Sequence, residues 1–97
     1  MPLTNTQKKH LRGLSHDLDP VVIVADKGLT DNVMDEVEQA LAHHELIKVR
    51  LRADRERRRS WIDRLLDQTH AELVQRIGQI VCLYRRNPEK PRIALPR

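Results

Sequence analysis

Aromatic residues are nearly missing from this sequence: its 97 residues include no Phe, one Trp and one Tyr. Proteins that read single-stranded bases by stacking usually present two or more exposed rings. That mode of recognition is therefore not expected, and any nucleic acid would be held mainly through its backbone and shape. The core must be aliphatic, and a hydrophobic content of 39% is enough for a modest one.

Cysteine and long apolar runs are also scarce. The single cysteine, Cys82, excludes an intrachain disulfide and suits a reducing compartment. No apolar run approaches the roughly 20 residues needed to span a bilayer. The N-terminal stretch MPLTNTQKKHLRG lacks the apolar segment of a secretion signal. We therefore expect a cytoplasmic protein with no membrane segment.

Patterns of catalytic and metal-binding residues are missing as well. The five histidines have no metal-ligand spacing, either with Cys82 or within a motif of two His and a Glu. Cys82 lies inside an apolar stretch, which is typical of an inert core residue rather than a nucleophile. No nucleophile elbow, phosphate-binding P-loop or carboxylate pair stands out. We expect no enzyme activity, no metal and no cofactor.

Positive charge is what the sequence has in excess. Lys and Arg number 18 against 14 acidic residues, which gives a net charge of +4. This balance is compatible with an anionic partner but does not by itself identify one. The distribution of the basic residues along the chain therefore matters more than their total.

Helix-capping residues predict where three helices begin. Thr4 and Gln7 have the spacing of a capping box, which indicates a first helix. Thr30 is a suitable N-cap for a second helix that ends near His44, and Asp54 for a third. Each predicted helix has an apolar stripe that can face a core.

Short β-branched or alternating segments predict four strands, at residues 21–25, 46–52, 72–77 and 80–85. Gly78-Gln79 between the last two suits a two-residue type II′ hairpin turn. The order α-β-α-β-α-β-β favours an α/β fold in which helices pack on a mixed four-stranded sheet. We expect one domain over residues 1–86 and a proline-containing tail at 87–97, lying on the domain or leaving it.

The loop Ala25-Asp26-Lys27-Gly28 joins the first strand to the second helix. A loop at a helix N-terminus presents unpaired N–H groups and the positive end of the dipole, and Gly28 permits a left-handed turn or close approach to a ligand. With the cation of Lys27, these are the parts of a phosphate site. Taken alone, however, the loop favours a plain strand-to-helix turn over a phosphate site, because every connection of this kind needs some turn.

A run of arginines opens the third helix. Arg55, Arg57, Arg58 and Arg59 lie near a helix N-terminus, where positive charge opposes the macrodipole at a cost of roughly a few tenths of a kcal/mol per pair. This conflict favours anion binding over a solvated charged face. Arg58 is also spaced to lie beside the apolar stripe, where its stem can pack.

The two aromatic residues are expected in different environments. Trp61 lies on the apolar stripe of the third helix and is expected in the core. Tyr84 lies in the last strand and is the one candidate for stacking on a base. Alternatively, Tyr84 is an ordinary strand residue whose hydroxyl lies at the sheet edge.

Several stretches together resemble a known family, the single-domain bacterial members of the CRM (chloroplast RNA splicing and ribosome maturation) domain. The resemblance is carried by LRGLSHDLDPVV, KGLTDNV, ALAHHELIKVR, IGQIVCLYRR and IALPR, which span almost the whole chain in order. It implies a fold similar to that of the C-terminal domain of bacterial initiation factor three. It also implies a GxxG loop, compared with the phosphate-clamping loop of KH domains. In this chain the loop is residues 25–28, with Ala25 in place of the first glycine and an acidic residue after it.

The resemblance implies a non-catalytic, monomeric RNA-binding protein that contacts structured ribosomal RNA during assembly of the large ribosomal subunit. The alternative is a protein-interaction adaptor that docks on ribosomal proteins or assembly factors through the acidic side of the second helix. The candidate RNA-binding residues are Ala25, Asp26, Lys27, Gly28, Lys8, Lys9, Arg12, Lys48, Arg50, Arg52, Arg55, Arg57, Arg58 and Arg59.

Overall fold

The computed structural model describes residues 2–97, which form three helices and one four-stranded sheet. In chain order the elements are α1 (Asn5–Ser15), β1 (Pro20–Val24), α2 (Asp31–His44), β2 (Leu46–Leu51), α3 (Arg55–Thr69), β3 (Glu72–Ile77) and β4 (Ile80–Tyr84). The predicted α/β order and the mixed sheet with packed helices are confirmed. Strand limits differ from the predicted ones by one residue at most.

The predicted caps fix where each helix begins. The Thr4 hydroxyl accepts a hydrogen bond from the Gln7 N–H at 3.1 Å, and the Gln7 side chain accepts one from the Thr4 N–H at 3.0 Å. Thr30 and Asp54 each accept from the backbone N–H three residues further on. These bonds satisfy N–H groups that a helix leaves without partners in its first turn.

The strands are arranged in the order β1-β2-β4-β3. β1 and β2 are parallel, and the two other pairs are antiparallel. Gly78 has φ +55°, whereas the only non-glycine residues of the described chain with positive φ are Glu45 and His70. Gln79 therefore has negative φ, as in the predicted type II′ turn and unlike a type I′ turn.

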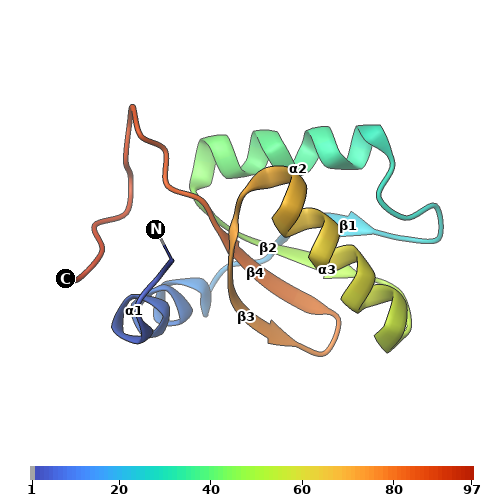
Figure 1. Ribbon diagram of the computed structural model, residues 1–97, viewed down its shortest axis with the longest axis horizontal. Helices are drawn as coiled ribbons and strands as arrows, with labels where there is room; N and C mark the ends of the chain where they lie inside the picture. Colours follow the sequence, from blue (N-terminus) through green and yellow to red (C-terminus); the bar gives the residue numbers. More distant parts are fainter. Residues whose placement is uncertain (1) are drawn as a thin grey trace.

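Helices cover the two faces of the sheet unequally (Figure 1). α2 and α3 pack on one face, where the main core contains Val24, Leu41, Leu51 and Leu65. α1 and the residues after β4 pack on part of the other face around Leu11. Along β2, every second side chain enters the main core, so Lys48 and Arg50 lie on the opposite face of the sheet, where α1 packs.

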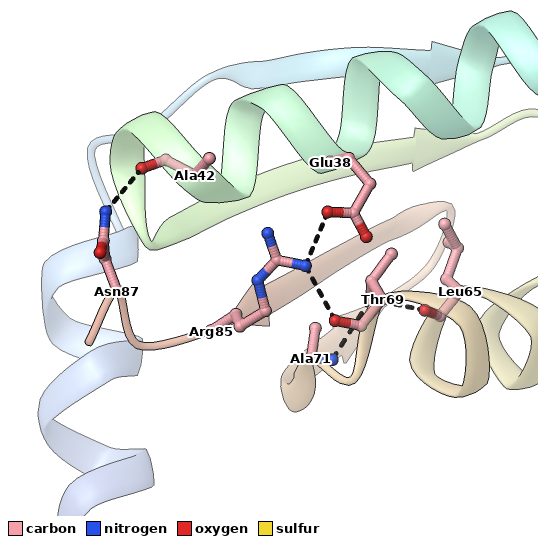
Figure 2. Close-up of polar contacts among 7 residues, drawn as sticks. All are labelled: Glu38, Ala42, Leu65, Thr69, Ala71, Arg85 and Asn87. Atoms are coloured by element: carbon pink, nitrogen blue, oxygen red, sulfur yellow. Dashed lines mark hydrogen bonds and ion pairs between the residues drawn. The ribbon is translucent and has the colours of Figure 1, made fainter. Parts of the chain in front are cut away.

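The end of the sheet where β4 finishes is held together by Arg85 (Figure 2). Its Nη1 donates to Glu38 Oε2 of α2 at 2.8 Å and to the carbonyl of Thr69, the last residue of α3, at 2.9 Å. In the same region, Asn87 Nδ2 donates to the Ala42 carbonyl at 3.3 Å. One arginine therefore joins the middle of α2 to the C-terminal end of α3, the two helices that cover the main core.

Residues 87–97 lie on the domain and are tied to it by a buried carboxylate. Glu45 is fully buried, and its two oxygens accept from the N–H groups of Asn87, Arg92 and Ile93 at 2.6, 2.6 and 2.9 Å. Ile93 and Leu95 pack against the core beneath α1. The boundary at residue 86 stays a prediction, but the segment after it is part of the packed structure.

Within residues 2–97, every helix is too short or too polar to cross a membrane.

Candidate nucleic-acid interface

Three basic segments meet at one end of the sheet (Figure 1). β1 and β2 are parallel, so the loop after β1 and the segment leading into α3 leave the same edge. The Arg52 N–H donates to the Val24 carbonyl at 2.8 Å, and the Leu51 N–H donates to the Gln79 carbonyl of the hairpin turn at 2.7 Å. We call this region the basic end; its cations are Lys27, Arg52, Arg55, Arg57, Arg58, Arg59 and Arg76.

The loop of residues 25–28 is a closed turn. The Gly28 N–H donates to the Ala25 carbonyl at 2.8 Å, and the Gly28 carbonyl accepts from the Thr30 N–H at 3.0 Å. Gly28 has φ +72°, a left-handed conformation that favours glycine. Its N–H is therefore used inside the protein and does not face a ligand, contrary to what a simple phosphate clamp requires. Lys27 is exposed at the tip of the turn.

Trp61 joins this loop to the arginines of α3. A Cβ on Gly28 would lie 3.5 Å from the Cζ2 and Nε1 atoms of Trp61, so the loop backbone packs on the indole. Arg57 Cζ lies 4.9 Å from the centroid of the Trp61 ring, as in a cation–π contact, and its Nη2 is 3.4 Å from the Asp26 carbonyl oxygen. Trp61 is a core residue, as predicted, and it also supports the charged surface.

A cleft of about 740 Å³ separates the start of α3 from the β3–β4 hairpin. It is lined by Arg55, Arg58, Arg59, Arg76 and Gly78, together with Glu56. Arg76 was not among the predicted site residues. The alternation of side chains in the hairpin predicts only the face of the sheet on which Arg76 lies. Its position beside α3 follows from the strand order, in which β4 lies between β2 and β3.

Arg58 differs from the other arginines of the run. It is half-buried, and its Nη1 donates to the Ala53 carbonyl at 2.9 Å. This agrees with its predicted place beside the apolar stripe of α3. Arg55, Arg57 and Arg59 are exposed.

Most of the positive charge is unpaired. In the described chain, which contains all 18 Lys and Arg residues, the only ion pair is between Arg85 and Glu38. Asp54 and Glu56 lie at the start of α3, yet neither comes within 4.0 Å of a basic nitrogen. The charges of the basic end are therefore available to an external anion.

A second basic group lies on the face of α1. Lys9 and Arg12 of α1 and Lys48 of β2 line a hollow of about 750 Å³, which we call the α1-face hollow. Arg50 is exposed on the same face of β2. Lys8 is half-buried on α1 and does not line this hollow. The predicted basic residues therefore form two groups, and Arg50 lies between them along β2.

Tyr84 and Cys82 belong to the core beneath α1. Tyr84 is 3% exposed, so of its two predicted interpretations, stacking on a base is wrong. Burial raises the pKa of its hydroxyl, and the negative charge of Glu45 adds to the effect. Burial also raises the pKa of the Cys82 thiol, which keeps it protonated and unreactive. No group of three potential metal ligands was found among the described residues.

Comparison with known proteins identifies the family. The model of the CRS1/YhbY (CRM) domain matches residues 3–85. A protein of Pseudomonas aeruginosa, named a probable RNA-binding protein, is 49% identical over 90 residues, covering 92% of this chain and 86% of that protein. An RNA-binding protein of Haemophilus influenzae is 48% identical over 96 residues, covering 98% of this chain and 96% of that protein.

A solved structure has the same fold. The solution structure of a hypothetical protein of Staphylococcus aureus superimposes with a TM-score of 0.81 at 34% identity, and the match covers 97% of this chain and 99% of that one. The family expected from the sequence is thus confirmed over nearly all of its length. The chain belongs to the CRS1/YhbY (CRM) domain family.

Proposed function

We propose that the protein is a non-catalytic RNA-binding protein that contacts structured ribosomal RNA during assembly of the large ribosomal subunit, acting as a monomer in the cytoplasm. Its relatives in Pseudomonas aeruginosa and Haemophilus influenzae carry RNA-binding in their names. The role in ribosome maturation follows from the family resemblance.

The observation that carries the proposal is the basic end. There the loop after β1, the first turns of α3 and the β3–β4 hairpin bring together Lys27 and several arginines, none of which has an acidic partner among residues 2–97. The planar fork of an arginine matches a phosphate group, and several of them on helices and strands form a rigid array. Such an array fits the closely spaced phosphates of a folded RNA.

Recognition of the backbone fits the rest of the surface. Both aromatic rings are buried, which removes stacking on exposed rings as the basis of binding. Lys27 projects from the turn after β1, where it adds a mobile cation next to the Arg57–Trp61 stack. The RNA is then held through phosphates and shape, with a mild sequence preference.

Filter binding to ribosomal RNA at several salt concentrations tests the proposal. We expect the logarithm of the association constant K to fall linearly with the logarithm of the salt concentration, with a slope of about −0.7 to −0.9 per phosphate contact. Replacing Arg55 and Arg59 by Gln should weaken binding and make the slope shallower. The matched control replaces Arg64 and Arg97, which are exposed and outside the cleft, and should change binding much less. Salt-independent binding would contradict the proposal.

An adaptor that docks on a ribosomal protein is the second candidate. α2 exposes Asp31, Asp35 and Glu36 to solvent, which suits a basic protein partner. Replacing Asp35 and Glu36 by Asn and Gln should leave RNA affinity unchanged or slightly higher. Loss of pre-ribosome association in that variant, with RNA binding intact, would favour the adaptor.

A further inference from the structure

The α1-face hollow has features that the basic end lacks. We propose that it holds an unpaired nucleotide of the bound RNA, so that the protein recognises a single-stranded segment next to a folded one. This inference rests on the proposed function and adds the class of RNA element to it. It assigns a use to the part of the sheet face that α1 leaves open.

The lining of the hollow suits one nucleotide. Ile77 and Ile80 offer an aliphatic surface for the flat side of a base, and the half-buried amide of Gln75 can donate and accept hydrogen bonds at its edge. Lys9, Arg12 and Lys48 supply positive charge for the phosphates, against a single acid, Asp17. None of these three cations has an ion-pair partner in residues 2–97.

Gly13 is an independent observation in favour of a ligand. It lies in the last turn of α1 and at the rim of the hollow, and glycine is less favourable than alanine within a helix. Its φ is not positive, and a Cβ there would meet nothing within 4 Å. Neither the backbone nor packing therefore requires a glycine at this position. A missing side chain at the rim does allow a ligand to approach the helix backbone.

A row of cations connects the hollow with the basic end. Lys48, Arg50 and Arg52 occupy alternate positions from β2 onward, so consecutive members lie on the same side about 6.6 Å apart where the strand is regular. Lys48 lines the hollow, and Arg52 belongs to the basic end. One RNA can thus place its folded part at the basic end and its unpaired strand along this row.

The test compares two RNAs that differ only in an unpaired segment. One is a blunt RNA hairpin, and the other carries a 3′ overhang of about five nucleotides, made in versions with each of the four bases. For the wild-type protein we expect the overhang to raise affinity by at least about fivefold, because it adds phosphate contacts and base burial. We also expect the gain to differ between bases, because the Gln75 amide can read a base edge.

Two variants locate the effect. Gly13→Ala should raise the melting temperature of the protein yet reduce the gain from the overhang, and Lys48→Gln with Arg12→Gln should bring the ratio of the two affinities close to one. Lys90→Gln with Arg64→Gln removes the same two charges from exposed positions outside the hollow and should leave that ratio as in the wild type. If the wild type binds both RNAs equally, or the hollow variants keep the wild-type ratio, the inference is overturned. If the wild type binds neither RNA, the proposed function itself fails.

Discussion

The backbone of Gly28 lies against the indole ring of Trp61, 33 positions further along the chain, close enough that a Cβ on Gly28 would be 3.5 Å from two ring atoms. Arg57 covers the same ring, with its Cζ 4.9 Å from the centroid. The loop after β1 and the arginines of α3 are therefore parts of one surface with a shared aromatic support. A change in either part should affect the other.

The first prediction concerns the conformation of Gly28. Gly28→Ala should destabilise the protein by about 1–2 kcal/mol, because φ +72° is costly for a residue with a Cβ. The contacts at 3.5 Å are ordinary van der Waals contacts and should add little. Chemical denaturation measures the change. Gly78→Ala is the matched control, since Gly78 also has positive φ but a Cβ there would meet nothing within 4 Å. A much larger loss for Gly28→Ala than for Gly78→Ala would show that packing on Trp61 dominates.

The second prediction separates neighbouring arginines of α3. Arg58→Gln should destabilise the protein by about 1 kcal/mol, because it removes the hydrogen bond to the Ala53 carbonyl and the packing of the arginine stem. Arg59→Gln should leave stability unchanged or raise it by a few tenths of a kcal/mol, because it removes a cation from the positive end of the helix dipole. Thermal melting measures stability, and RNA titration measures binding. Arg59→Gln should bind RNA more weakly although the protein stays fully folded. Equal melting temperatures for the two variants would contradict a structural role for Arg58.

Local signals in the sequence predicted the elements of the fold well. Thr4, Thr30 and Asp54 are caps in the structure because a hydroxyl or carboxylate three residues before a free N–H can satisfy it without help from distant residues. The strand at residues 46–52 was likewise predicted from its alternation, since side chains of a strand alternate between faces whatever the neighbouring strand is.

The contacts that build the candidate site could not be predicted in this way. The pairing of β1 with β2 brings the loop after β1 beside α3, and the place of β4 brings Arg76 to the same cleft. Both depend on the order of strands, which local patterns do not specify. Glu45 is the clearest case: it looks like an ordinary polar residue at a helix end, yet its partners lie 42 to 48 positions away.

The third prediction concerns the buried carboxylate of Glu45. Burial raises its pKa, but the N–H groups of Asn87, Arg92 and Ile93 lower it, and the net effect is a pKa below the ordinary value of 4.5. A carboxyl group with a lowered folded-state pKa stabilises the protein above its unfolded-state pKa, and this stability is lost as pH falls through the folded-state value. We expect the free energy of unfolding to decline below about pH 4.5 and the tail to loosen at the same time. Hydrogen exchange of the Arg92 and Ile93 amides measures that loosening.

Glu45→Gln is the matching variant. It should destabilise the protein by about 2–3 kcal/mol at neutral pH, because the neutral amide accepts weaker hydrogen bonds and turns an NH₂ group toward backbone donors. It should also flatten the acid dependence of stability. An acid profile identical to that of the wild type would mean that other carboxyl groups cause the decline.

The fourth prediction concerns Ala25, which stands where the family resemblance implies a glycine. Ala25 is exposed and uses its carbonyl, not its side chain, in the turn with Gly28. Ala25→Gly should cost about 0.5–1 kcal/mol of stability through the added freedom of the unfolded chain. It should keep or increase RNA affinity, because it removes a methyl group from the path of an approaching backbone. Weaker binding by the folded variant would argue against close approach of RNA to this turn.

The last prediction isolates the one lysine of the loop. Lys27 is exposed, and within residues 2–97 its side chain makes no hydrogen bond or ion pair, so Lys27→Gln should leave the melting temperature unchanged. If its ammonium group contacts a phosphate, the variant should bind all RNA sequences more weakly by a similar factor. The slope of log K against log salt concentration should also become shallower by the value of about one phosphate contact. Lys90→Gln provides the control, because it removes the same charge from the tail, away from the basic end. Should both variants lower affinity equally without a change in slope, Lys27 would act only through the net charge of the protein, and phosphate contacts at the basic end would have to come from the arginines alone.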